Sequence, residues 1–178
     1  MSTIESRVPI EWDRMRGNVT ELTARDVMTR NIITVRDDAP LSELVAILSE
    51  HMITGVPVVD ENGKLVGVVS TTDIALHSAK RTSSVRRDRP PDFYLRGWET
   101  SEDELRSFSI EEDSGEVVSD IMTPVIFSVS ENARFQEMAD TMVGGRVHRL
   151  IVTDGDSVIG IVTTLDLLRG LRDRWPKA

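Results

Sequence analysis

The chain has no cysteine, few aromatic residues and no long apolar run. Without cysteine, its 178 residues form neither a disulfide framework nor a thiolate metal site. No segment approaches the roughly 20 apolar residues that a membrane-spanning helix needs. The first residues also lack the apolar stretch of a secretory signal. We therefore expect a soluble protein in the cytoplasm.

Positive charge is also in short supply. The chain carries 21 Lys and Arg against 30 Asp and Glu, a formal net charge of −9. Proteins that bind nucleic-acid duplexes obtain most of their affinity from Lys and Arg at phosphates, so this balance argues against broad nucleic-acid binding. A small phosphorylated ligand remains compatible with it, because such a ligand needs only one or two local cations.

The sequence contains an internal repeat. Residues 25–44 align with residues 119–138 at a spacing of 94, and LVGVVSTTDI at 65–74 returns as VIGIVTTLDL at 158–167, at a spacing of 93. One residue is therefore lost between the two blocks, most simply in a loop around Gly144-Gly145. A unit this short buries too little apolar surface to fold alone, so the two copies are expected to share a core.

Each copy predicts a strand, a helix, a two-stranded hairpin and a second helix. Residues 32–35 and 126–129 are typical of short strands. Asp38 before Pro40 favours the start of a helix. The hairpins turn at Asn62-Gly63 and Asp154-Gly155, and short helices follow Thr72 and Leu165. The residues expected on the core face of the longer helices are Leu41, Leu44, Val45, Leu48 and Met52, then Phe135, Met138, Ala139 and Met142.

A hydroxyl residue and an aspartate recur in register after each hairpin. Ser70 stands three residues before Asp73, and Thr163 three before Asp166. One interpretation is a capping box at a helix N-terminus. The other is a ligand site, because a helix N-terminus attracts phosphate and an aspartate can accept hydrogen bonds from ribose hydroxyls. The two interpretations are compatible.

The ordered set of motifs resembles a tandem pair of cystathionine-β-synthase (CBS) domains, a Bateman module. The matching stretches are DVMT and DIMT, the helix faces, TGVPVVDENGKLVGVVSTTDI and VHRLIVTDGDSVIGIVTTLDL. The resemblance implies an α/β fold in which two β-α-β-β-α repeats pack about a pseudo-twofold axis. It also implies association into homodimers, and two clefts for adenosine-type ligands: AMP, ADP, ATP, S-adenosylmethionine or NAD.

The resemblance assigns the basic pair His148 and Arg149 to the first cleft, beside the phosphates. Leu165 departs from the pattern, because many nucleotide-binding members carry a second hydroxyl there. Arg149 could alternatively be a surface arginine on a strand end. A metal-binding role for His148 is disfavoured, because no carboxylate pair completes a zinc pattern. The residues assigned to this cleft are Met28, Asn31, Ile33, Thr54, Gly55, Val56, Pro57, His148, Arg149, Thr163 and Asp166.

The second cleft is the weaker of the two. Gly55 and Val56 occupy the positions that His148 and Arg149 hold in the first, so a triphosphate is poorly matched there. A nucleoside, a monophosphate or no ligand is expected. The residues assigned to this cleft are Ser70, Thr72, Asp73, Thr123, Val125, Phe127 and Val147.

The segment between the copies, residues 81–115, is basic in its first half and acidic in its second. Its charge and Pro90-Pro91 suit a solvated linker. Four of the eight aromatic residues of the chain lie in it, however, and these favour docking of residues 92–98 on the folded pair. We also predict a short helix over 101–108. The aromatic residues of the segment are Phe93, Tyr94, Trp98 and Phe108.

Together these features divide the chain into five parts. They are an N-terminal extension (1–21), a first repeat (22–80), the inserted linker (81–115), a second repeat (116–172) and a C-terminal tail (173–178). The leading hypothesis is a regulatory module that senses an adenosine nucleotide, AMP first, and signals to a partner protein. The alternative is a ligand-free dimerisation or interaction module. An enzyme is disfavoured, because no cluster offers a nucleophile, a base and an orienting group together.

Overall fold

The computed structural model describes residues 21–79, 92–95 and 115–174. They form two three-stranded sheets of the same topology, in which the first strand runs parallel to the second and the second antiparallel to the third. The strands are β1 (Val35–Arg36), β2 (Gly55–Val59), β3 (Leu65–Ser70), β4 (Ser128–Ser130), β5 (Arg149–Asp154) and β6 (Ser157–Thr163). The expected α/β fold with a repeated β-α-β-β-α order is confirmed.

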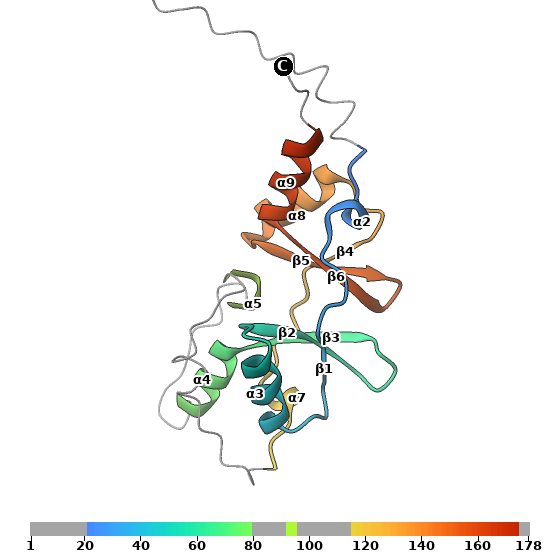
Figure 1. Cartoon of the computed structure of the whole chain (residues 1–178). Coiled ribbons are helices and arrows are strands. Elements are labelled where there is room, and N and C mark those ends of the chain that lie inside the picture. The colour runs from blue at the N-terminus through green and yellow to red at the C-terminus, as the bar shows by residue number, and fades with distance from the viewer. Residues whose placement is uncertain (1–20, 80–91, 96–114, 175–178) are drawn as a thin grey trace, which may run out of the picture.

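Helices cover the outer side of each sheet, while the sheets lie next to each other at the centre (Figure 1). Helices α2, α8 and α9 lie on the side of β4–β5–β6, and α3, α4 and α7 on the side of β1–β2–β3 (Figure 1). The helices are α2 (Ala24–Val27), α3 (Leu41–Glu50), α4 (Thr71–Ala79), α5 (Asp92–Leu95), α7 (Val118–Ile121), α8 (Phe135–Gly145) and α9 (Thr164–Arg174).

The helix-face predictions hold except at the C-terminal end of α3. Leu41, Leu44 and Leu48 are buried, but Met52 is 58% exposed because α3 ends at Glu50 and Met52 has a left-handed φ of 51°. In the second copy Met138 and Met142 are buried, with Phe135 packed against the same cluster.

The expected loop at Gly144-Gly145 is wrong, because both glycines belong to α8. The helix ends at Arg146, whose left-handed φ of 53° matches that of Met52 at φ 51°. Since these two residues still stand 94 positions apart, the lost residue falls after Arg146 rather than at the glycines.

The first strand is later and shorter than predicted, starting at Val35 instead of residue 32. Val68 of β3 uses both of its backbone hydrogen bonds on Thr123. The backbone of Pro57, which lies opposite Val68 in β2, is therefore turned away from β3 and toward β1. Proline has no N–H to donate, and pairing therefore cannot extend to residues 32–34. The second copy begins its strand at Ser128, two residues after the predicted start.

Each copy sends its first short helix into the other half of the fold. Ala24 N of α2 donates to Ala133 O (2.9 Å), and 94 residues later Val118 N of α7 donates to Ala39 O (2.9 Å). Ala24 belongs to the apolar cluster of the second sheet, and Val118 to that of the first. The copies therefore exchange these helices, and neither core is complete without its partner.

The glycine in the middle of each hairpin's second strand permits this exchange. A Cβ on Gly160 would lie 2.7 Å from Met28 Sδ and 2.9 Å from Thr29 O, and one on Gly67 would lie 2.9 Å from Thr123 O. Backbone from the other copy thus crosses directly over each glycine. Thr29 and Ile161 exchange backbone hydrogen bonds of 2.8 and 3.0 Å at the first crossing.

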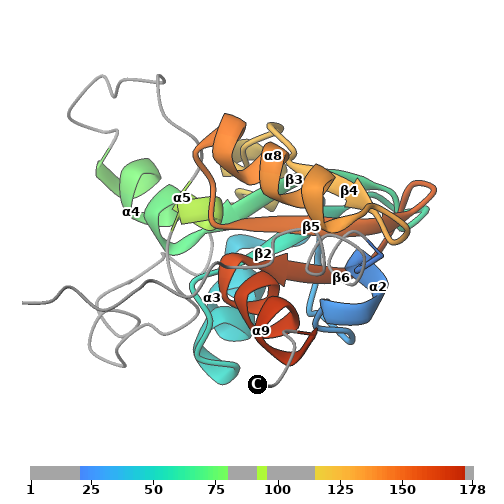
Figure 2. The same ribbon diagram turned by 90° about the horizontal axis from the view of Figure 1, so that it is seen from above.

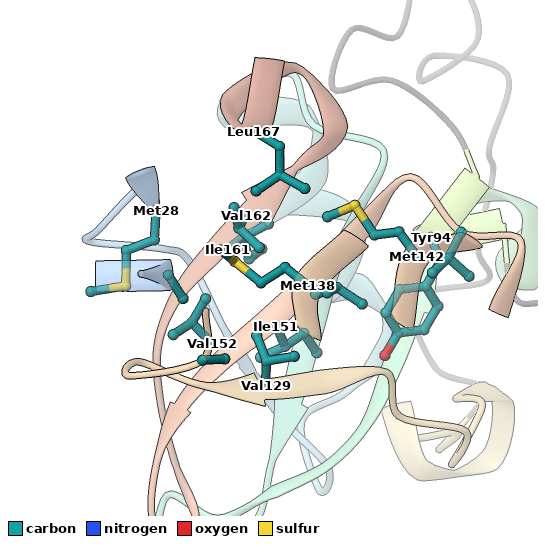
Figure 3. Packing of buried hydrophobic residues seen from close by; sticks show 14 of the residues in the cluster. Met28, Tyr94, Val129, Met138, Met142, Ile151, Val152, Ile161, Val162 and Leu167 are labelled. Carbon is teal, nitrogen blue, oxygen red and sulfur yellow. The ribbon is translucent and has the colours of Figure 1, made fainter. Parts of the chain in front are cut away.

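Helix α5 carries the aromatic pair of the inserted segment into the core, beside β3 and β5 (Figure 2). Phe93 is 1% exposed and Tyr94 0%. The rings of Phe93 and Tyr94 meet edge to face at 4.9 Å, and Tyr94 meets Phe127 in the same way at 5.0 Å. Figure 3 shows Tyr94 beside Met142 at the edge of the apolar cluster of the second sheet. The predicted docking is confirmed for these two residues, while Trp98 and the predicted helix 101–108 lie outside the described residues.

Gly160→Ala should destabilise the fold by about 1–3 kcal/mol, because the added methyl collides with Met28 and with the backbone of Thr29. Gly144→Ala is the matched control. It lies in α8 with open space around it, and alanine there should be neutral or stabilising by up to about 1 kcal/mol. Chemical denaturation of both variants measures the difference, and equal stabilities would contradict the close crossing.

Tyr94, the single tyrosine of the chain, should resist ionisation in the folded protein. Burial raises the pKa of its hydroxyl above the ordinary value, against the smaller effect of the Phe127 N–H. Because the pKa is higher in the folded chain, the contribution to stability is complete below about pH 10 and declines as the pH rises further. Tyrosinate absorbance should appear near pH 10 in denaturant and at clearly higher pH in the native protein. Identical titrations would contradict burial of Tyr94.

Candidate functional site

Two candidate sites lie where the last strand of each hairpin opens into a helix. At the first site, Thr163 ends β6 and donates to Asp166 Oδ2 from its backbone N (2.9 Å) and its Oγ1 (2.6 Å). Asp166 N donates back to Thr163 Oγ1 (3.2 Å). At the second site, Ser70 N and Oγ donate to Asp73 Oδ2 at 2.8 and 2.6 Å. The capping-box interpretation is therefore confirmed at Thr163, and at Ser70 the structure shows the half of the box in which the Asp73 carboxylate accepts from Ser70.

The caps use only one oxygen of each carboxylate. Asp166 Oδ1 lies 3.6 Å from the guanidinium of Arg169, on the next turn of α9. Asp73 Oδ1 accepts a long hydrogen bond of 3.5 Å from Thr123 Oγ1, which comes from the second copy. A ligand hydroxyl can therefore bind at Asp166 Oδ1 without breaking the cap, so the capping and ligand interpretations remain compatible.

The crossing segments bring residues of the opposite copy to each site. Thr29 pairs with Ile161 in β6, two residues before Thr163. It thereby places the segment that contains Met28, Asn31 and Ile33 beside the first site. Met28 is buried against Gly160, while Asn31 is exposed with a left-handed φ of 57°.

The four residues from Thr54 to Pro57 are buried against β3. Gly55 pairs with Ser70, and Thr71 N donates to Thr54 O at 2.9 Å. This places the stretch beside the strand end of the second site. Phe93 lies between this stretch and Arg149 of the first site, since it contacts both Gly55 and Arg149. Sequence reasoning did not assign Phe93 to a site, and the aromatic composition of the insert was the signal that could have done so.

Arg149 is a buried cation and not a surface arginine. Its side chain is 2% exposed, and Cζ lies 5.3 Å from the centre of the Phe93 ring. Burial lowers the pKa of its guanidinium to about 10, so the group keeps its positive charge at neutral pH. Arg149 pairs with Thr163 across β5 and β6, so its backbone lies beside the end of the strand that leads into α9, while its guanidinium lies against the Phe93 ring. The neighbouring His148 is exposed.

Tyr94 contacts residues assigned to both sites, Phe127 of the second and His148 of the first. Phe127 N donates to Tyr94 Oη at 2.8 Å, and Tyr94 O accepts from His148 N at 2.8 Å. Val147 is buried in the same cluster, whereas Val125 is 48% exposed. Thr72, next to Asp73, is half-buried in the first turn of α4. Tyr94 was not among the predicted site residues.

Metal and membrane signatures are absent from the part of the chain that the structure describes. No group of three or more His, Asp or Glu residues there could hold a metal ion. Over the same residues, no helix combines the length and the apolar character that crossing a membrane would require.

The chain matches known proteins over both copies. The CBS domain family matches residues 24–80 and 118–173. The CBS domain-containing protein CBSX2, chloroplastic, of Arabidopsis thaliana is 34% identical over 151 residues, which are 83% of this chain and 62% of that protein. The chain therefore spans less than two thirds of this relative.

Solved structures show the same fold. The CBS domain of a CBS domain-containing membrane protein from Sphaerobacter thermophilus is 26% identical, with a TM-score of 0.61, over 89% of this chain and 93% of that one. The crystal structure of CBSX2 in complex with AMP is 25% identical, with a TM-score of 0.58, over 85% of this chain and 96% of that one. With two family matches in tandem and the fold of a CBS pair, the chain belongs to the CBS domain family.

Proposed function

We propose that the chain is a cytoplasmic regulatory module that binds an adenosine-type nucleotide, with AMP as the first candidate, at the first site and signals its occupancy to a partner protein. The observation that carries the proposal is that Asp166, which keeps one oxygen outside its cap, follows the strand end at which the buried residue Arg149 pairs with Thr163. The likeness to CBSX2, whose structure contains AMP, supports it.

Each part of a nucleotide has a counterpart at this site. The ribose hydroxyls would donate to Asp166 Oδ1. The phosphate would lie at the N-terminus of α9, an eleven-residue helix whose positive dipole end and first N–H groups attract anions. Arg149 adds a full positive charge. The base would contact the crossing segment from Met28 to Ile33, which the Thr29–Ile161 pairing holds beside β6.

The second site suits a phosphate less well. The residue that pairs with Ser70 is Gly55, whereas the residue that pairs with Thr163 is Arg149, so the second site has no cation at the matching position. A charge-assisted contact to phosphate is roughly twice as strong as a neutral hydrogen bond. We therefore assign AMP to the first site before the second. Further candidate ligands for the first site are ADP, ATP, S-adenosylmethionine and NAD.

A ligand-free dimerisation module is the second candidate function. The caps at Thr163 and Ser70 satisfy their own hydrogen bonds, which is what a purely structural role requires. Large apolar side chains are also exposed on neighbouring helices, Leu165 and Leu168 on α9 and Val143 on α8. Such side chains fit a homodimer interface, in which a second copy would cover them.

AMP should raise the thermal midpoint of the protein. A ligand that binds only the folded state adds about 2.7 kcal/mol at a hundredfold excess over Kd, or roughly 5–11 °C for a domain of this size. Adenosine should act more weakly, because it lacks the phosphate. A midpoint unmoved by millimolar AMP, ADP, ATP, S-adenosylmethionine or NAD would favour the dimerisation module.

Asp166→Ala should weaken AMP binding about tenfold or more, because a hydrogen bond to a charged group contributes about 1.5–3 kcal/mol. Asp73→Ala is the matched control. It removes the equivalent cap at the second site and should cost a similar ~1 kcal/mol of stability, with AMP affinity unchanged. Titration calorimetry and denaturation measure both variants. Equal affinities for the two variants would assign Asp166 to capping alone.

A further inference from the structure

Tyr94 lies against the second site and hydrogen-bonds to it. Phe127, one of the residues assigned to that site, donates its backbone N–H to Tyr94 Oη at 2.8 Å and meets the Tyr94 ring edge to face at 5.0 Å. The Tyr94 carbonyl accepts from His148 N at 2.8 Å. The ring is fully buried. Tyr94 is therefore held by both its backbone and its side chain.

This arrangement has the chemistry of a bound base. A nucleobase is a flat aromatic ring with hydrogen-bonding atoms on its edge, and Tyr94 presents a flat ring with an oxygen at its edge. That oxygen accepts the hydrogen bond that a ring nitrogen of a base would accept from the same N–H. Phe93, the preceding residue of α5, packs against Gly55, which pairs with Ser70 at the strand end of the second site, and against the guanidinium of Arg149.

At the first site, no described residue accepts a hydrogen bond from the corresponding backbone donor. Ile33 corresponds to Phe127 at the spacing of 94. Its N–H makes no hydrogen bond to any residue in the three described ranges. Within the described ranges, this backbone donor is therefore bonded to Tyr94 in one copy and has no acceptor in the other, although the two copies share their topology and crossing segments.

We propose that Tyr94 occupies the second site as a built-in substitute for a base, so that one chain binds one adenosine-type ligand, at the first site, until the Phe93-Tyr94 pair leaves. This rests on the proposed function for the identity of the ligand. It makes the inserted segment a competitor of the second ligand, and any partner that draws α5 away would create a second nucleotide site.

Titration calorimetry with AMP counts the sites. We expect one AMP per chain for the unaltered protein and two for Tyr94→Ala, because this change removes the ring and the hydroxyl together. In the double variant Tyr94→Ala, Asp73→Ala the count should return to one, since Asp73 belongs to the second site. In the double variant Tyr94→Ala, Asp166→Ala, the AMP binding that remains should be that of the second site.

The outcomes separate this inference from the proposed function. The inference is overturned if the unaltered chain binds two AMP molecules with equal affinity. It is also overturned if folded Tyr94→Ala binds only one. No binding to the unaltered chain together with one event in Tyr94→Ala rejects the first site and supports the substitution by Tyr94. No binding to either protein overturns both.

A measurement without ligand covers the case in which Tyr94→Ala does not fold. Tyr94→Phe keeps the buried ring and loses only the acceptor for Phe127 N–H. Hydrogen exchange at the Phe127 amide should become at least tenfold faster. The Ile151 amide, which donates to Phe127 O at 3.0 Å, is the internal control and should be unchanged. Unchanged exchange at Phe127 would show that Tyr94 does not hold this donor and would overturn the inference.

Discussion

The fold depends on the close backbone crossing at Gly160 and Gly67. At each glycine, a segment from the opposite copy approaches so closely that a Cβ atom would collide with it. The crossings are closed by paired backbone hydrogen bonds, Thr29 with Ile161 and Thr123 with Val68. Because protein interiors are densely packed, neither copy can keep its core if the crossing segment leaves. The two copies therefore fold as one body and not as two adjacent domains.

The same crossings determine where the two candidate sites lie. Each one lies two residues before the strand end at which a hydroxyl and an aspartate cap the next helix. A helix N-terminus from one copy thus faces an extended segment from the other. This geometry is repeated twice, so the fold itself provides two equivalent positions. The side chains placed on it make them chemically unequal.

The inequality arises from two local differences. Arg149 is a buried cation at the first residue of β5, where the counterpart in β2, by its pairing with the last strand of the hairpin, is Gly55. The inserted segment then adds Phe93 and Tyr94, which pack between β3 and β5 and bond to Phe127 and His148. A buried arginine beside an aromatic face is stabilised by the ring quadrupole. The insert thus contacts the cation assigned to the first site and, in the proposed arrangement, occupies the second.

The sequence by itself determined the repeat, the order of elements, the turns at Gly63 and Gly155, and the caps, because each follows from local periodicity or from contacts three residues apart. Only the tertiary structure decided the exchange of α2 and α7, the loss of strand pairing opposite Pro57, the burial of Arg149 and the position of Tyr94. These four depend on residues more than twenty positions apart. Hydrophobic periodicity predicts which side chains are buried, but it does not indicate which distant segment covers them.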